Sequence, residues 1–160
     1  MNRTSLKSDR IAIVSVMLTF LPLCGSFLPL TAQTKDTGML TVRVTGARNT
    51  KGKIGVTLFQ SAQGFPDDTS KAIRQQSVDI DPSTMGAEVT FKNLPQGTFA
   101  VSALHDENGN GKMDKNFVGM PKEGYGASNN PKKKKRAPTF DEAKFSLNSS
   151  EQAIEITLIY

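Results

Sequence analysis

Apolar and polar residues alternate along most of the chain after residue 33. Every second residue is apolar over 40–44 and again over 54–58, which is typical of strands with one buried face. Similar alternations predict five further strands, at 76–80, 87–91, 99–105, 144–147 and 153–160. The turn-forming residues of 49–52 predict that the first two strands pair as a hairpin. No segment after residue 33 carries the 3.6-residue apolar stripe of a helix.

Seven short strands within residues 33–160 predict an all-β fold, an antiparallel sandwich of two sheets around one core. The succession of strands stops over 107–143, which is rich in Gly, Pro, Asn and Lys and poor in apolar residues. Loops longer than roughly 12 to 15 residues are usually functional or disordered. We therefore expect this insertion, between the fifth and sixth strands, to carry the chemistry of the protein.

Residues 1–32 have the pattern of a secretory signal peptide. Arg3, Lys7 and Arg10 precede an apolar run over 11–23, and small and turn-forming residues follow that run. The run is shorter than the roughly 20 residues that a membrane-spanning helix needs, which favours a cleaved signal over the alternative of a retained anchor.

Two cleavage sites fit this segment, one after Ala32 and one after Ser26. Cys24 raises the alternative of a lipoprotein, but Leu23 stands where a small residue should precede a lipidated cysteine, so lipidation is not expected. Cleavage would leave one β-sandwich domain over 33–160, with no transmembrane span. We expect this domain to be periplasmic or secreted.

The chain is basic, with 20 Lys and Arg residues against 15 Asp and Glu residues. Residues 1–32 hold three basic residues and one acidic residue, so 17 basic and 14 acidic residues follow them. Five of the 17 are consecutive, and without them the balance is 12 against 14. The positive charge is therefore local, in a loop formed by Lys132, Lys133, Lys134, Lys135 and Arg136.

Such a basic run is most often a solvated loop, and the functional alternative is contact with an anionic surface. We predict that it attracts anionic lipid headgroups or envelope polysaccharide, with each residue near such a surface contributing about 1 kcal/mol. Nucleic acid is not an expected partner, because the chain carries an export signal and few aromatic residues lie close to the basic run.

The cysteine and histidine content excludes several classes of site. A single Cys excludes an internal disulfide framework and a Cys-rich zinc or iron–sulfur site. The single His, His105, ends the inward face of the fifth predicted strand. No second His and no Gly-x-Ser-x-Gly motif accompany it, so we expect it to cap the core and hydrogen-bond the insertion. The sequence thus predicts a protein that is not an enzyme.

The strongest candidate for chemistry is an Asp- and Asn-rich segment at the start of the insertion. Oxygen-bearing side chains at alternate positions, a Gly at the sixth position and a carboxylate at the ninth match the first nine positions of a calcium-binding loop. The predicted ligands are the side chains of Asp106, Asn108, Asn110 and Asp114 and the carbonyl of Lys112.

The same segment departs from an EF-hand. Its twelfth position is Phe117 instead of Glu, and no helix pattern flanks it. A further carboxylate would have to complete the calcium shell, and Glu123 and Asp141 are the candidates within the insertion. We predict weak calcium binding, with a Kd on the order of 10⁻⁴ to 10⁻³ M. The alternative is a tight turn whose Asp and Asn side chains bond their own backbone.

Parts of the chain resemble known families. The segment 91–101, with Leu94, Pro95 and Gly97, resembles the hallmark of transthyretin-like and carboxypeptidase-regulatory-like sandwiches. The chain also resembles an exported bacterial family of unknown function, DUF2141, over 105–114, 119–130 and 137–143.

The resemblance to DUF2141 covers essentially the whole chain after the signal peptide. The departures are Ala127, where members usually carry Phe, and a longer basic run before Pro138. The resemblance implies an immunoglobulin-like or transthyretin-like β-sandwich that is periplasmic or secreted. It implies no established reaction.

Together these patterns predict an exported binding or structural module of the bacterial envelope, with a loop stabilised by calcium. The alternative is a hydrolase that acts on envelope carbohydrate or peptide through the insertion's carboxylates, Asp106, Asp114, Glu123 and Asp141. A catalytic pair would stay free of metal and contain one carboxyl with a raised pKa, whereas a structural calcium site would lose order on chelation.

Overall fold

The computed structural model describes residues 37–132 and 136–160. The predicted signal peptide over 1–32, including Cys24, and the lysines Lys133, Lys134 and Lys135 of the basic run lie outside the described residues. The described strands are β1 Thr37–Thr45, β2 Lys53–Phe59, β3 Arg74–Val78, β4 Ala87–Pro95, β5 Gly97–Asp106, β6 Gly124–Ala127, β7 Phe145–Leu147 and β8 Glu151–Thr157. A 3₁₀ turn, Thr69–Lys71, and a one-turn helix, α1 Phe140–Ala143, complete the elements.

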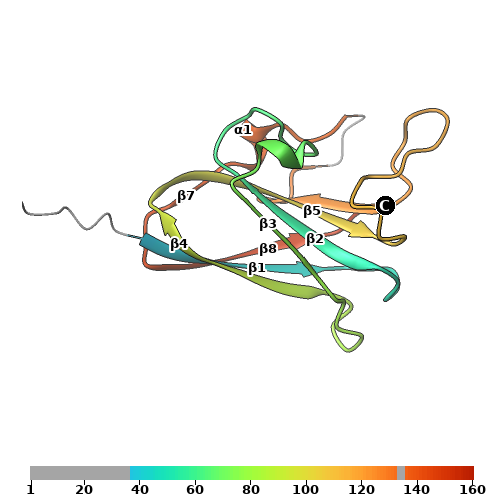
Figure 1. Ribbon diagram of the computed structural model, residues 1–160, viewed down its shortest axis with the longest axis horizontal. Coiled ribbons are helices and arrows are strands. Elements are labelled where there is room, and N and C mark those ends of the chain that lie inside the picture. Colours follow the sequence, from blue (N-terminus) through green and yellow to red (C-terminus); the bar gives the residue numbers. More distant parts are fainter. Residues whose placement is uncertain (1–36, 133–135) are drawn as a thin grey trace, which may run out of the picture. The chain divides into compact units, whose positions relative to one another are not determined.

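The strands form two sheets that face each other, as the sequence predicts (Figure 1). One sheet has the order β4-β1-β8, and the other has the order β3-β2-β5-β6, with β7 paired to the start of β5. The prediction of an antiparallel sandwich is confirmed for every strand pair but one. β1 and β8 run parallel, because the chain returns to the first sheet through β7 and not through a hairpin from β1.

The alternating residues of the sequence form the core between the sheets. On β1, β2 and β5 every second side chain is buried, and the chain's longest alternations supply most of the core. Burying one such aliphatic or aromatic side chain contributes roughly 1.5–3 kcal/mol. The core side chains of these three strands are Leu40, Val42, Val44, Ile54, Val56, Leu58, Phe99, Val101 and Ala103.

The predicted hairpin between the first two strands is wrong. β1 pairs with β4 and β8, whereas β2 pairs with β3 and β5, so residues 46–52 carry the chain from one sheet to the other. Gly52 has a φ of 68° and packs so closely on the Asp106 carbonyl that any side chain there would overlap it. Alternation shows which face of a strand is buried, but not which strand lies beside it.

The composition of the insertion 107–143 predicts a segment without strands or helices, and this prediction is wrong. The insertion contains β6, which pairs with β5, and the short helix α1. The inward positions of β6 are Gly124 and Gly126, which lie directly against Tyr160 and Ile156. Because β6 approaches the other sheet this closely, it has no room for apolar side chains and so no recognisable strand pattern.

The described residues contain no helix that is long and apolar enough to cross a membrane.

Candidate functional site

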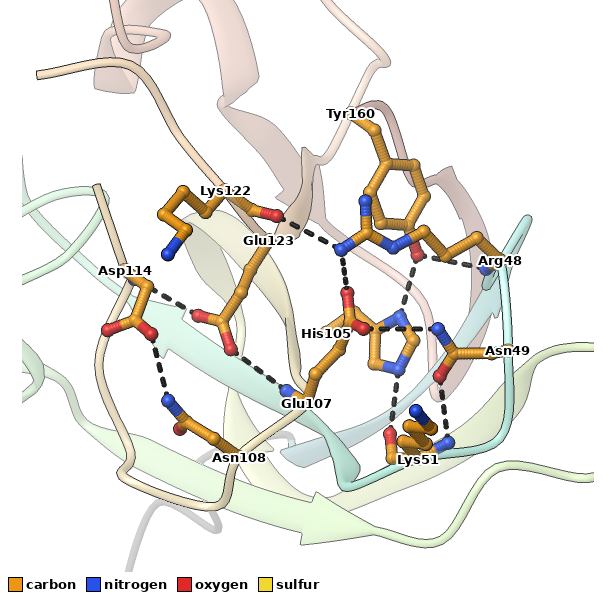
Figure 2. Close-up of polar contacts among 10 residues, drawn as sticks. All are labelled: Arg48, Asn49, Lys51, His105, Glu107, Asn108, Asp114, Lys122, Glu123 and Tyr160. Carbon is orange, nitrogen blue, oxygen red and sulfur yellow. Dashed lines mark hydrogen bonds and ion pairs between the residues drawn. The ribbon is translucent and has the colours of Figure 1, made fainter. Parts of the chain in front are cut away.

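The loop over 107–123 leaves the end of β5 and returns as β6, and a buried carboxylate closes its base. Glu123 is only 4% exposed. Its two carboxylate oxygens accept hydrogen bonds from the backbone N–H groups of Glu107, at 2.9 Å, and Asp114, at 3.0 Å (Figure 2). Glu123, one of the two candidates for completing a calcium shell, thus lies beside the Asp- and Asn-rich segment and holds two of its backbone positions together.

Asp106 organises the first half of this loop. Its carboxylate accepts from the backbone N–H groups of Gly109 and Asn110 at 2.9 and 3.1 Å through one oxygen, and from that of Gly111 at 2.8 Å through the other. Asn108 accepts from the N–H of Asn110, and Asn110 accepts from the N–H of Lys112. These are the side-chain-to-backbone bonds of consecutive Asx turns.

Asp114 lies opposite the two asparagines. The side-chain amide nitrogen of Asn108 donates to one Asp114 oxygen at 2.8 Å, and that of Asn110 donates to the other at 3.0 Å. The four side chains predicted to bind calcium, Asp106, Asn108, Asn110 and Asp114, therefore lie in one loop. In this loop the side-chain amide N–H groups of the two asparagines face the Asp114 carboxylate.

Asp141 does not join this group. It lies on α1, where it forms an exposed ion pair with Lys144 at 2.8 Å. α1 packs near Ala100 at the start of β5, whereas the loop leaves β5 at its end (Figure 1). Within residues 37–132 and 136–160, no three His, Cys, Asp or Glu side chains gather as a metal-binding group. A cation at the loop would therefore need Asn and carbonyl oxygens in addition to the Asp114 carboxylate.

His105 is fully buried, and its partners differ from those expected. Its Nε2 lies 2.9 Å from the Lys51 carbonyl and its Nδ1 lies 2.6 Å from the Tyr160 hydroxyl (Figure 2). A carbonyl only accepts, so Nε2–H donates to Lys51, and Nδ1 of the neutral ring accepts from the Tyr160 O–H. His105 thus joins the 46–52 turn to the end of the chain, and its side chain does not bond the insertion.

Arg48 extends this network to the insertion. Its backbone N–H donates to the Tyr160 hydroxyl at 3.0 Å, and its guanidinium lies 4.6 Å from the centre of the Tyr160 ring. The guanidinium also forms an ion pair with Glu107 and donates to the Lys122 carbonyl at 3.1 Å. Asn49 donates to Glu107 at 3.0 Å.

These partners could not be found from the sequence, because they belong to no motif and lie 54 or more positions apart along the chain. The only available signal was the position of Tyr160 in the last alternating segment. That segment places Tyr160 on the same face as Ile156, which is buried in the core.

The environment of the network changes two pKa values. Burial raises the pKa of Glu107, but hydrogen bonds from Asn49 and Arg48 and the positive charge of Arg48 outweigh burial, so the net pKa is below its usual value. Burial raises the pKa of the Tyr160 phenol, and the nearby negative charge of Glu107 adds to this effect. Tyr160 therefore stays protonated and able to donate to His105.

The outer face of the larger sheet forms the floor of a groove of about 810 Å³, which we call the outer groove. Phe65 and Phe140 pack against Ala100 and cover one end of this face. The loop 107–123 borders the remaining part through Met113, Met120 and Pro121, and Pro66 and Pro138 also line it. The floor consists of small and polar residues together with one aliphatic and one aromatic side chain, namely Gly55, Thr57, Gln75, Ser77, Ser102, Leu104 and Tyr125.

The described part of the basic run is not a freely solvated loop. Arg136 donates to both carboxylate oxygens of Glu142, at 2.8 and 2.9 Å, and these hydrogen bonds raise its pKa. Glu142 also accepts from the backbone N–H of Thr139 in the capping box of α1. Arg136 thus anchors the approach to α1 and lines the outer groove, while Lys132 is exposed.

Replacement of Tyr160 by Phe should lower the free energy of unfolding by about 1–3 kcal/mol, because the His105 nitrogen and the Arg48 N–H both lose a partner. Urea unfolding monitored by circular dichroism measures this loss. Tyr125→Phe, which removes a hydroxyl from the outer face of β6, is the matched control and should change stability little. An equal effect of the two substitutions would contradict the role assigned to the Tyr160 hydroxyl.

Glu107→Gln should make the free energy of unfolding less dependent on pH in the acidic range. Because the folded pKa of Glu107 is lowered, its carboxylate adds stability above the ordinary glutamate pKa and loses it as the pH falls through the folded value. Unfolding midpoints between neutral pH and about pH 3 test this, since the variant and the parent should converge in acid. Glu88→Gln is the control, because it removes one side of an exposed ion pair with Arg43 and should change the unfolding midpoint little.

Comparison with known proteins identifies the family of the chain. No curated protein matches the chain, and no solved structure matches it. The family model described as "Uncharacterized protein conserved in bacteria (DUF2141)" matches residues 42–155, a span that runs from β1 to β8 and includes the loop, the groove floor and His105. The chain therefore belongs to the DUF2141 family of bacterial proteins.

Proposed function

We propose that the protein is an exported binding module of the bacterial envelope that holds a segment of polysaccharide in the outer groove. The observation that carries this proposal is the groove itself, about 810 Å³ of space over the polar face of a sheet. Ligand sites commonly have volumes of roughly 300–1,000 Å³ and combine apolar surface with a few polar groups. The outer groove has this composition.

The chemistry of the lining favours a polysaccharide over a purely apolar ligand. Thr57, Gln75 and Ser77 offer hydroxyl and amide groups that both donate and accept hydrogen bonds, as sugar hydroxyls require. Tyr125 offers an aromatic ring on the same floor. A sugar ring presents C–H groups on one face and hydroxyls around its edge, so this pairing of surfaces matches it.

Positive charge around the groove favours an anionic polysaccharide. Lys53, Lys112, Lys115 and Arg136 all line it. Three acidic residues also line it: Asp67, Asp106, which accepts from three backbone N–H groups, and Glu107, which bonds Arg48 and Asn49. Since Lys53 pairs with Asp79 and Arg136 with Glu142, the positive charge that favours an anionic ligand comes mainly from Lys112 and Lys115 on the loop. Attraction of the ligand to the wider basic run 132–136 is part of the same proposal.

Calcium would act on the loop that borders the groove. The side chains of Asn108, Asn110 and Asp114 converge within hydrogen-bond distance, and Asp106 and Glu123 hold the backbone around them. A hard cation prefers such oxygens, and rotation of either asparagine amide would turn its oxygen toward Asp114. The carbonyl of Lys112 remains the fifth proposed ligand, and Asp141 is too far along the sheet to contribute.

No contact among the described residues favours the hydrolase alternative. Asp106 and Glu123 accept from backbone N–H groups, Asp114 from two asparagines, and Asp141 pairs with Lys144. A glycosidase needs two carboxyl groups facing one substrate bond, one of them as a proton donor. Binding of a ligand in the outer groove requires no proton transfer by these carboxyl groups.

Binding of an acidic polysaccharide should depend on the groove floor. We expect Tyr125→Ala to weaken binding of soluble polygalacturonate by about tenfold or more, and Gln75→Ala by several-fold. Gln76→Ala is the matched control, because Gln76 lies next to Gln75 on β3 but points to the other face, where it bonds the Thr90 carbonyl. Isothermal titration calorimetry, with neutral dextran for comparison, measures these changes. Equal affinity of Tyr125→Ala and the parent would reject the outer groove as the site.

Millimolar calcium should raise the melting temperature in proportion to RT ln(1 + [L]/Kd), with Kd on the order of 10⁻⁴ to 10⁻³ M. Asp114→Asn should abolish the rise, since it removes the charge that the two asparagines face. Asp81→Asn is the control, because Asp81 accepts from Ser83 in a turn elsewhere in the chain. Absence of any heat or melting shift in the parent would leave the loop as an Asx turn alone.

A further inference from the structure

The loop 115–121 exposes three large apolar side chains next to one another. Phe117 is 100% exposed, Val118 is 64% exposed and Met120 is 53% exposed. Apart from Tyr160, these are the exposed large hydrophobic residues within residues 37–132 and 136–160. Folded proteins bury such groups or use them in binding, so three together on one loop require an explanation.

The loop is held in this shape by its own polar groups. The side-chain oxygen of Asn116 accepts from the backbone N–H groups of Val118 and Met120 at 3.0 and 2.9 Å. The backbone of Asn116 bonds Met120 and Gly119 at 2.8 and 2.9 Å. In Figure 1 the loop, drawn in orange, extends past the ends of the strands. Phe117 and Val118 are therefore presented outward by a preformed turn, with Met120 beside them at the border of the outer groove.

Positive charge surrounds this apolar tip. Lys112, Lys115 and Lys122 are all exposed and flank residues 116–121 on both sides. The acidic side chains of the loop are engaged elsewhere. Glu123 is buried at the loop base, Glu107 pairs with Arg48, and Asp114 accepts from two asparagines.

We propose that the tip formed by Phe117, Val118 and Met120 inserts into the interfacial region of an anionic lipid bilayer, with the flanking lysines on the headgroups. Peripheral proteins bind membranes through two contributions. Apolar side chains are buried at the boundary of the acyl chains, and Lys side chains are attracted to anionic headgroups. The inference does not depend on polysaccharide or calcium binding.

The size of the tip favours a bilayer over a protein partner. Phe117 offers about 150–250 Å² of surface, and its neighbours add less, whereas each partner in a standard protein interface buries about 800 Å². A bilayer needs no complementary pocket, so a small tip suffices when electrostatic attraction assists it.

The chain contains no Trp, so Phe117→Trp places a single reporter at the tip. With vesicles of phosphatidylcholine and phosphatidylglycerol, we expect a blue shift of its emission and quenching by brominated lipids. Ala153→Trp, at an exposed position of β8 on the other sheet, is the matched control and should show neither. No blue shift and no quenching for Phe117→Trp under conditions of binding would overturn the proposal.

Vesicle sedimentation separates the tip from other sources of binding. Phe117→Ser with Val118→Ser should weaken binding by about tenfold or more without changing the melting temperature, because both side chains are exposed. Tyr125→Ala should leave vesicle binding unchanged, which keeps the result independent of the outer groove. If binding instead survives the tip substitutions and is lost when 132–136 are replaced by Ser, the basic run is the membrane contact and the proposal is wrong.

Discussion

A buried imidazole needs a partner for each ring nitrogen, and His105 finds its partners in the two segments that follow the paired strands β1 and β8. The Lys51 carbonyl belongs to the turn between the sheets, and the Tyr160 hydroxyl follows the last strand. Because Tyr160 must reach His105, β6 can pass beneath it only with a glycine at position 124, while Gly126 leaves room for Ile156. The same hydroxyl fixes Arg48, which in turn bonds Glu107 and Lys122 at the two ends of the loop. The Tyr160 hydroxyl therefore also helps to fix where the ends of the loop are anchored.

The parts of the structure that the sequence predicts are those specified by nearby residues. The alternation at Leu40, Val42 and Val44 was enough to predict a strand with one buried face, and the spacing of Asp106 and Asp114 was enough to predict a loop closed by side-chain oxygens. Both patterns act over a few residues. Because distant contacts do not alter these two local patterns, the strand and the loop could be predicted without a structure.

The parts that could not be predicted depend on which distant segments meet. Nothing at residues 46–52 distinguishes a hairpin from a crossing between sheets, because the turn residues suit both and the choice is made by the partners of β1 and β2. β6 was missed since the close approach of Tyr160 and Ile156 replaces its apolar residues with glycine. Asp141 and Glu123 were equal candidates in sequence, and only the path of the chain after β6 separates them.

The loop's own hydrogen bonds also limit how strongly it can bind a cation. Asp106 and Glu123 together accept five backbone N–H groups, so the loop is closed before any ion enters. An ion would gain Asp114 and the asparagine oxygens but would have to displace the amide bonds that now face Asp114. Preorganisation favours binding, whereas the displaced hydrogen bonds oppose it. The calcium site proposed above should therefore be a weak one.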